Sequence, residues 1–187
     1  MDALTALLTR SSIGGLSEPA PDADALHAAF RAALRAPDHR LLRPWRYLTI
    51  RGEGRQALGQ AYLAAGLHDN PALGETERNR LLAMPLRAPL IVAAILSPRK
   101  DDKVPEYEQL LSMGAAIENF LVALHAQGYA GMWRTGWMAE HPLVRAALGL
   151  QPGEMIAGYL YCGTAASPAR TSTPLNVADF VQSWPSA

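Results

Sequence analysis

Two runs of apolar residues stand out along the chain. The first covers residues 88 to 96 and the second covers residues 155 to 162, before Gly163 and Thr164. Neither run shows the spacing of an amphipathic helix, and both have the length of a strand. They therefore predict two central strands of a sheet, each buried on both faces. Shorter apolar stretches predict further strands at 46–51 and 129–133.

The longest helical pattern runs from Leu110 to Leu124. Its apolar and small residues occupy all sides of a helical wheel, which is typical of a helix buried all round. Glu118, Asn119 and His125 interrupt a run that is already shorter than the roughly 18 uninterrupted apolar residues of a membrane span. We therefore expect this helix in the core, or in the core and a subunit interface. Gly128 suits the position that ends a helix.

Other segments place apolar residues at helical spacing and are predicted to be helices. Polar caps, prolines and glycines mark their ends. The segments run from Asp2 to Arg10, from Asp22 or Asp24 to Pro37, from Leu58 to Leu82 with a break near Asn70, and from Pro142 to Gly149.

Length and charge narrow the class of protein. The chain has 187 residues, of which 49% are hydrophobic, so residues 1–187 are expected to form one domain with its own core. The 17 Lys and Arg residues balance the 17 Asp and Glu residues, so no global field attracts nucleic acid or an anionic membrane. The single cysteine, Cys162, and the lack of a basic-then-apolar signal segment indicate the cytoplasm.

A ligand site is suggested by two clusters of polar residues. Arg10, Ser11 and Ser12 follow the first helix, and an arginine with two hydroxyls suits a phosphate, although such a tripeptide is also an ordinary helix end. The segment 133–135, Trp-Arg-Thr, stands at a strand end, where ligands tend to bind in sheet proteins.

The loop at residues 35–39 is richer than a connector needs, because it holds Arg35, Asp38 and His39. A turn-forming carboxylate explains Asp38 equally well. No metal site is predicted, since the histidines show no ligand spacing. The histidines are His27, His39, His68, His125 and His141.

The segment from Gly52 to Ala57 imitates the glycine-rich fingerprint of dinucleotide-binding proteins. That fingerprint needs a second parallel strand soon after its helix, whereas helical sequence here continues to Leu82. We interpret the segment as a glycine turn that starts a helix. A dehydrogenase that binds its dinucleotide through this segment stays open as an alternative, and a substitution at Gly54 would distinguish the two.

Together these segments resemble the FMN-dependent nitroreductases, in particular their compact single-domain members. The resemblance rests on motifs that follow one another in order along nearly the whole chain: Arg10 with Ser12, Arg35-Ala36-Pro37-Asp38-His39, Pro44-Trp45, Gly52-Glu53-Gly54-Arg55, Arg87-Ala88-Pro89-Leu90-Ile91, Lys103-Val104-Pro105, Gly131 with Trp133-Arg134, and Gly158-Tyr159-Leu160-Tyr161 with Gly163-Thr164. It implies an α+β fold with a mixed central sheet flanked by helices. It also implies an intertwined homodimer in which a C-terminal arm, residues 168–187, packs on the partner subunit.

The resemblance further implies an FMN site at the subunit interface. The loop at residues 10–12 would hold phosphate and ribityl oxygens, residues 133–135 would form another wall, and Arg35 and His39 would reach in from the second subunit. The implied FMN contacts are Arg10, Ser11, Ser12, Arg35, His39, Trp133, Arg134 and Thr135. The implied contacts of NAD(P)H are Ala123, Leu124, His125, Ala126, Gln127 and Gly128.

The implied reaction is a ping-pong transfer of two electrons. NAD(P)H gives a hydride to flavin N5, and a small nitroaromatic or quinone-like acceptor then takes the electrons. The flavin performs this chemistry, so no catalytic side chain is predicted. Related proteins often carry basic residues where Ser11 and Gly15 stand, and larger ones carry Asn and Gln near Leu41 and Arg43. These departures keep open a second hypothesis, an FMN-binding module without significant turnover.

Overall fold

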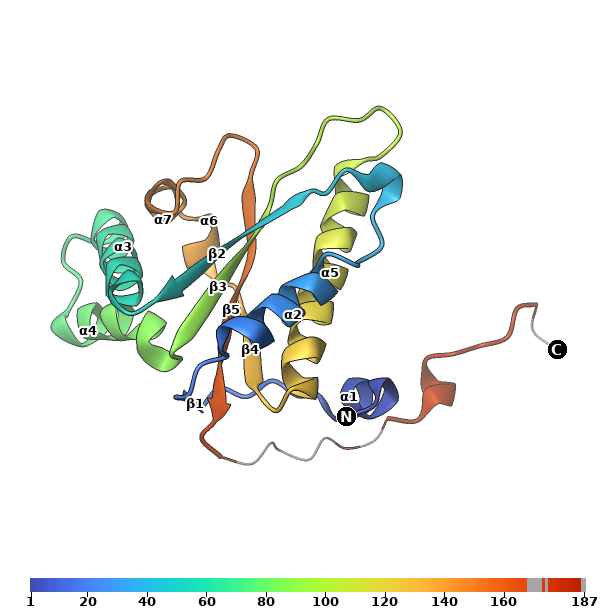
Figure 1. Ribbon diagram of the computed structural model, residues 1–187. Helices are drawn as coiled ribbons and strands as arrows, with labels where there is room; N and C mark the ends of the chain where they lie inside the picture. Colours follow the sequence, from blue (N-terminus) through green and yellow to red (C-terminus); the bar gives the residue numbers. More distant parts are fainter. Residues whose placement is uncertain (168–172, 174, 186–187) are drawn as a thin grey trace.

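The computed structural model describes residues 1–167, 173 and 175–185 (Figure 1). Its centre is one five-stranded sheet in which β5 and β3 are neighbours and β2 forms an edge. The sheet also includes β4 and β1, which pair with β5. The strands are β1 (Leu16–Ser17), β2 (Trp45–Arg51), β3 (Leu90–Leu96), β4 (Ala130–Arg134) and β5 (Met155–Ala165).

Helices cover both faces of this sheet. Figure 1 shows α1, α2 and α5 on one side, and α3, α4, α6 and α7 on the other. The helices are α1 (Ala3–Thr9), α2 (Ala23–Ala33), α3 (Glu53–Asp69), α4 (Glu75–Ala83), α5 (Glu106–Ala126), α6 (Trp137–Glu140) and α7 (Pro142–Ala147). Short 3-10 helices are η1 (His39–Leu41), η2 (Met84–Arg87) and η3 (Val177–Asp179).

The prediction of two central strands is confirmed. Every residue of β3 is buried, because successive side chains point to opposite faces and each face has its own helical cover. Leu90 and Val92 pack in the cluster with α2 and α5, whereas Ile91 and Ala93 pack in the cluster with α3. A strand with no exposed face needs no polar positions, which is why its sequence is a continuous apolar run.

The mixed sheet implied by the resemblance is not found among the strands of this chain. All four pairings between the strands named above are antiparallel. The long helix α5 returns the chain so that β4 runs in the same direction as β3, but β5 lies between them and is antiparallel to both. In the described part of the chain, the isolated bridge between Ser12 and Gly131 is parallel.

The predicted end of β5 is wrong. The strand continues to Ala165, because β1 and β4 provide partners for it beyond Cys162. A Cβ atom on Gly163 would lie 2.8 Å from both Pro89 Cδ and the Ser17 carbonyl oxygen. The glycine therefore allows neighbouring segments to approach the strand closely, and it does not mark the strand's end.

The prediction of a helix buried all round holds only for part of α5. Residues such as Ile117 and Phe120 are fully buried, but Leu110 and Leu111 near the start are exposed, Leu111 by 68%. At the other end, Gly128 has a positive φ of 89° and its N–H donates to the His125 carbonyl, as predicted. The helix thus anchors the core with one half and leaves apolar surface on the other.

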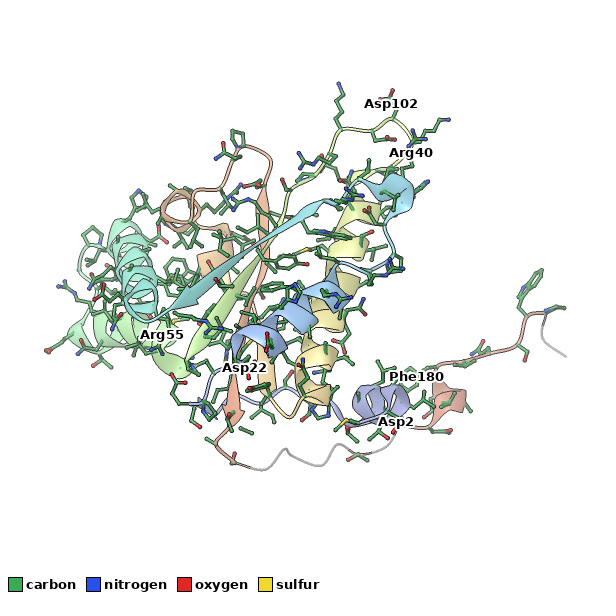
Figure 2. The ribbon with its side chains drawn as sticks, in the orientation of Figure 1. Asp2, Asp22, Arg40, Arg55, Asp102 and Phe180 are labelled. Carbon is green, nitrogen blue, oxygen red and sulfur yellow. The ribbon has the colours of Figure 1, made fainter. Side chains whose placement is uncertain are left out.

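Capping residues begin the first two long helical segments as the sequence predicted. Asp2 accepts a hydrogen bond from Thr5 N (3.1 Å) and Asp22 accepts one from Ala25 N (2.8 Å). Figure 2 shows both carboxylates at their helix ends. No helix in the described part of the chain combines the length and apolar character needed to cross a membrane.

The turn after β2 agrees with our interpretation of the glycine-rich segment. Gly52 has a positive φ of 49° and precedes α3 directly. The next strand, β3, pairs antiparallel with β2. The parallel strand that a dinucleotide fingerprint requires is therefore not next to β2.

Part of the predicted C-terminal arm lies outside the described residues, namely 168–172, 174 and 186–187. Figure 1 shows the segment 175–185 apart from the sheet, beyond α1. Phe180 and Trp184 in this segment are exposed, Trp184 by 93% (Figure 2 labels Phe180).

An ion pair fastens the start of β2 to the loop before β5. Glu154 is only 5% exposed and accepts hydrogen bonds from Arg46 Nε (2.7 Å) and Gln151 N (2.8 Å). Its carbonyl oxygen accepts a further bond from Arg145 Nη2 (2.6 Å). The hydrogen bonds from Arg46 lower the pKa of Glu154 from 4.5 to about 2.

We predict that Glu154→Gln lowers the free energy of unfolding at pH 7 by about 2–3 kcal/mol, because Arg46 loses its charged partner. The folded-state pKa of Glu154 is depressed, so its contribution is fully present above about pH 4.5 and declines as the pH falls toward 2. Urea denaturation should show the gap between variant and wild type shrinking over that interval. Glu77→Gln, in the exposed pair with Arg80, is the control and should cost less than about 1 kcal/mol. Equal losses in the two variants would contradict the prediction.

Candidate functional site

The loop after α1 lies against strand β4. Ser12 forms a bridge with Gly131, and Ile13 N donates to the Gly131 carbonyl oxygen (3.2 Å). A Cβ atom on Gly14 would be 3.3 Å from Arg134 Nη2, so the guanidinium of Arg134 lies beside this loop. The structure therefore brings the loop at residues 10–12 and the segment at residues 133–135 together, although more than 100 residues separate them in sequence.

Arg10 is held in place by α5. Its Nε donates to Glu118 Oε1 (2.8 Å), and its side chain is largely covered. Ser11 is half-buried and Ser12 is exposed. Within the described residues, the terminal nitrogens of Arg10 donate to no acceptor, so they and the two hydroxyls remain able to bind phosphate oxygens.

Trp133 occupies a fixed position above β5. Its Nε1 donates to the Ala157 carbonyl oxygen (3.1 Å). A Cβ atom on Gly158 would lie 2.0 Å from that nitrogen, so only glycine leaves room for the indole. The next residue, Arg134, places its guanidinium carbon 5.5 Å from the centre of the Tyr161 ring.

A pocket of about 350 Å³ opens beside these residues, between β4, β5, α3 and η2. Aromatic and methionine side chains form most of its wall, and two arginines, Arg87 and Arg134, also line it. Tyr159 is 2% exposed, and its hydroxyl has no hydrogen-bond partner in the described structure. An aromatic wall with a few polar groups fits a flat ring.

The sequence assigned no site role to Arg87, Tyr159 or Tyr161, although their motifs contributed to the resemblance. Arg87 ends η2, and two residues separate it from the fully buried strand β3. A cation at the edge of a buried strand was a usable signal. The two tyrosines gave none, since aromatic residues in a central strand are ordinarily core.

His39 lies elsewhere in the same chain. Arg35 follows α2 and is exposed, and His39 Nδ1 is 2.8 Å from Glu108 Oε2. His39 and Glu108 line a separate pocket of about 370 Å³. Glu108 precedes Glu118, the partner of Arg10, by ten residues on α5, which corresponds to about 15 Å along the helix. A single chain therefore does not bring His39 to Arg10.

The predicted nicotinamide segment, residues 123–128, joins α5 to α1 and α2. His125 Nε2 is 2.8 Å from Thr9 Oγ1, and Gln127 Nε2 donates to the Ala25 carbonyl oxygen (3.3 Å). Leu124 is fully buried. None of the six residues lines the 350 Å³ pocket. Their contacts hold helices together, and the nicotinamide contact stays a prediction.

His68, Asp69 and His141 meet at the end of α3, an arrangement that the sequence did not reveal. Leu143 N donates to His141 Nδ1 (3.2 Å), so the proton of the neutral imidazole lies on Nε2, which donates to Asp69 Oδ1 (3.2 Å). For Nε2 to bind a metal, the proton would have to move to Nδ1, which already accepts the hydrogen bond from Leu143 N. We therefore interpret the group as a hydrogen-bond network that fastens α3 to α7.

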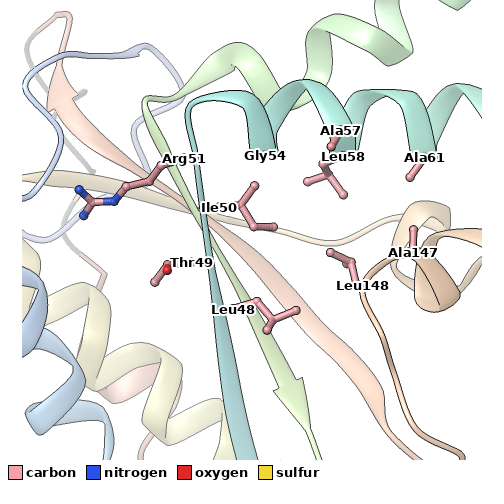
Figure 3. Close-up of a pocket in the computed structure, with 10 residues that line it drawn as sticks. All are labelled: Leu48, Thr49, Ile50, Arg51, Gly54, Ala57, Leu58, Ala61, Ala147 and Leu148. Atoms are coloured by element: carbon pink, nitrogen blue, oxygen red, sulfur yellow. The ribbon is translucent and has the colours of Figure 1, made fainter.

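A further pocket of about 440 Å³ lies between β2, α3 and α7 (Figure 3). Gly54 and Ala57 of the fingerprint-like segment border it, and aliphatic side chains such as Leu58 and Leu148 form its wall. The guanidinium of Arg51 points away from the pocket in Figure 3 and donates to the Pro21 carbonyl oxygen (3.0 Å). The pocket thus has no cation directed at a nucleotide phosphate.

Comparisons with known proteins agree with one another. The model of the nitroreductase family matches residues 7–164. The chain is 41% identical over 183 residues, 96% of both chains, to "Putative NAD(P)H nitroreductase YdjA" of Escherichia coli strain K12. A nitroreductase-like family protein from Bacillus cereus has a similar structure, with a TM-score of 0.83, 21% identity and coverage of 99% of this chain and 97% of that one. The FMN and NADPH-dependent nitroreductase NfnB from Sphigopyxis sp. strain HMH gives a TM-score of 0.77 at 21% identity over 100% of both chains.

We predict that Gly158→Ala displaces Trp133, because the new methyl group would overlap the indole. The variant should lose the hydrogen bond to Ala157, change its tryptophan emission and lose about 1–3 kcal/mol of stability. Fluorescence spectra and urea denaturation measure both effects. Gly74→Ala is the control, because its Cβ would meet nothing within 4 Å. If both variants keep the wild-type emission, the fixed position of Trp133 is refuted.

Proposed function

The chain belongs to the nitroreductase family, and from this premise we propose that it is an FMN-dependent oxidoreductase that uses NAD(P)H to reduce small nitroaromatic or quinone-like acceptors. The relative YdjA is named as an NAD(P)H nitroreductase, and NfnB is described as FMN and NADPH-dependent. The observation that carries the proposal is the packing of the loop at residues 10–15 against β4, next to the pocket lined by Arg134.

The residues at this place fit FMN. Arg10, Ser11 and Ser12 offer a guanidinium and two hydroxyls to a phosphate and a ribityl chain. The neighbouring pocket offers an aromatic wall to a flat ring. Bound FMN would supply ping-pong chemistry, in which it takes a hydride from NAD(P)H and passes two electrons to the acceptor.

The protein's own part is to bind and position, so no side chain needs to act as a nucleophile. The hydrogen bond to Ala157 fixes Trp133 as one wall of the site. Thr135 is exposed beside it and adds a hydroxyl. Arg134 brings a positive charge that lies over Tyr161. Such preorganised groups act without rearranging during the reaction.

We also propose a homodimer with FMN at the subunit interface. Within one chain, His39 lies far along α5 from Arg10, so His39, and with it Arg35, would serve the FMN of the partner subunit. Glu108 would orient His39 for this contact through the bond to Nδ1. Leu110 and Leu111 on the same helix are exposed apolar residues that a partner would cover.

The C-terminal arm would embrace the partner in this dimer. Its described part exposes large apolar side chains, which a soluble monomer rarely leaves uncovered. These side chains are Leu175, Val177, Phe180, Val181 and Trp184. We also propose that residues 123–128 contact the nicotinamide nucleotide and that the protein works in the cytoplasm.

An FMN-binding module without turnover is the second candidate function. The resemblance implies basic residues where Ser11 and Gly15 stand, and their absence favours this candidate, because fewer cations face the phosphate. Steady oxidation of NAD(P)H in the presence of a nitroaromatic or a quinone separates the two candidates, since a module without turnover would show none.

The first experiment is the visible absorption spectrum of the purified protein, followed by NADH and then NADPH without oxygen. We expect oxidised flavin bands that bleach with at least one nucleotide. Bleaching followed by recovery with a quinone would establish both half-reactions. A protein that carries no flavin and binds none after FMN is added would refute the proposed function.

We predict that Arg10→Ala weakens FMN binding at least tenfold, because the phosphate loses a charged donor. His39→Ala should keep FMN and turn over more slowly. Flavin fluorescence quenching and steady-state kinetics measure these effects.

Mixed dimers test the assignment to two subunits. When the Arg10→Ala and His39→Ala chains are unfolded together and refolded, half of the chains should form mixed dimers in which one site carries both wild-type residues. Activity should then exceed the average of the two variants. Activity equal to the average of the two variants would contradict a contribution of His39 from the partner subunit.

A further inference from the structure

Arg87 is a cation of the 350 Å³ pocket that the proposed FMN contacts leave without a role. It is the last residue of η2, is exposed and lines the pocket together with Arg134. Within the described residues, neither guanidinium donates to an acceptor or pairs with a carboxylate. Guanidinium groups bind anions through forked hydrogen bonds, so two arginines at one cavity suit an anionic occupant.

The charges on the pocket wall support an anion. None of its lining residues is acidic in the described structure, so two like charges face the cavity without compensation. The charges of Arg134 and Arg87 both act on the Tyr161 hydroxyl. Burial raises the pKa of the Tyr161 hydroxyl, whereas the charges of Arg134 and Arg87 oppose that rise. The two arginines therefore act on the same point of the wall.

The shape of the pocket favours a ring over a phosphate. Tyr62 and Tyr159 pack edge to face with ring centres 5.9 Å apart, and methionines such as Met84 and Met132 fill the remaining wall. A phosphate needs several donors around it, whereas this wall is mostly apolar. A flat ring that gains negative charge would use both the apolar wall and the two cations.

We propose that Arg87, acting with Arg134, favours the reduced form of FMN over the oxidised form. This inference rests on the proposed function. Transfer of a hydride from NAD(P)H to the neutral oxidised ring gives NAD(P)⁺ and a reduced ring that carries one additional negative charge. A preorganised positive charge beside the ring stabilises that product more than the reactant. Arg87 is thus an electrostatic residue of the cofactor site.

The test is an anaerobic redox titration of bound FMN in the wild type, Arg87→Met and Arg87→Lys. We expect Arg87→Met to lower the preference for reduced over oxidised FMN about tenfold, which corresponds to a potential about 30 mV more negative for a two-electron couple. Arg87→Lys keeps the charge and should retain most of the wild-type potential. Arg31→Met is the matched control, because Arg31 is an exposed arginine of α2 that does not line the pocket.

The outcomes separate this inference from the proposed function. A wild type that binds no FMN refutes the proposed function itself. If FMN binds but Arg87→Met keeps the wild-type potential, or shifts no more than Arg31→Met, the role of Arg87 is refuted alone. An equal loss of affinity for oxidised and reduced FMN also refutes it, because the residue would then bind both forms alike. Thermal unfolding of each variant verifies that the exposed substitutions leave the fold intact.

Discussion

The burial of β3 on both faces is the constraint on which the rest of the structure depends. A strand with no exposed side chain requires a helical layer on each side, and the chain supplies them from different segments. The layer on one side holds α5, whose glutamates bind Arg10 and His39 from other segments. The layer on the other side holds α3 and η2, which wall the pocket beside β4. The site is therefore a product of how the sheet is covered.

Much of the fold could be predicted from local sequence because its signals are local. The strand at β3, the capping by Asp22 and the helix end at Gly128 each depend on the identities of a few neighbouring residues. The sequence predicts a strand end at Gly163 because a glycine that ends a strand cannot be distinguished in sequence from a glycine that lets a neighbouring segment approach closely. Only the positions of Pro89 and Ser17 distinguish them.

The candidate site could be predicted in parts. The polar character of Arg10 and Arg134 was visible, but their meeting depends on the bridge between Ser12 and Gly131, which has no local signature. The pocket at Arg87 depends on how η2 and β4 lie across β5, and the meeting of Asp69 with His141 depends on two helices from opposite halves of the chain. These features depend on contacts between residues that are far apart in sequence. Such contacts cannot be inferred from a single sequence.

The rigid spacing of Glu108 and Glu118 limits how the chain can evolve. Both carboxylates hold residues from distant loops, and both stand on one uninterrupted helix. One residue inserted between them would rotate one carboxylate by about 100° relative to the other and shift it by about 1.5 Å. Insertions in the loop at residues 97–105 leave this relation intact. The segment between the two carboxylates can thus change its residues but not its length.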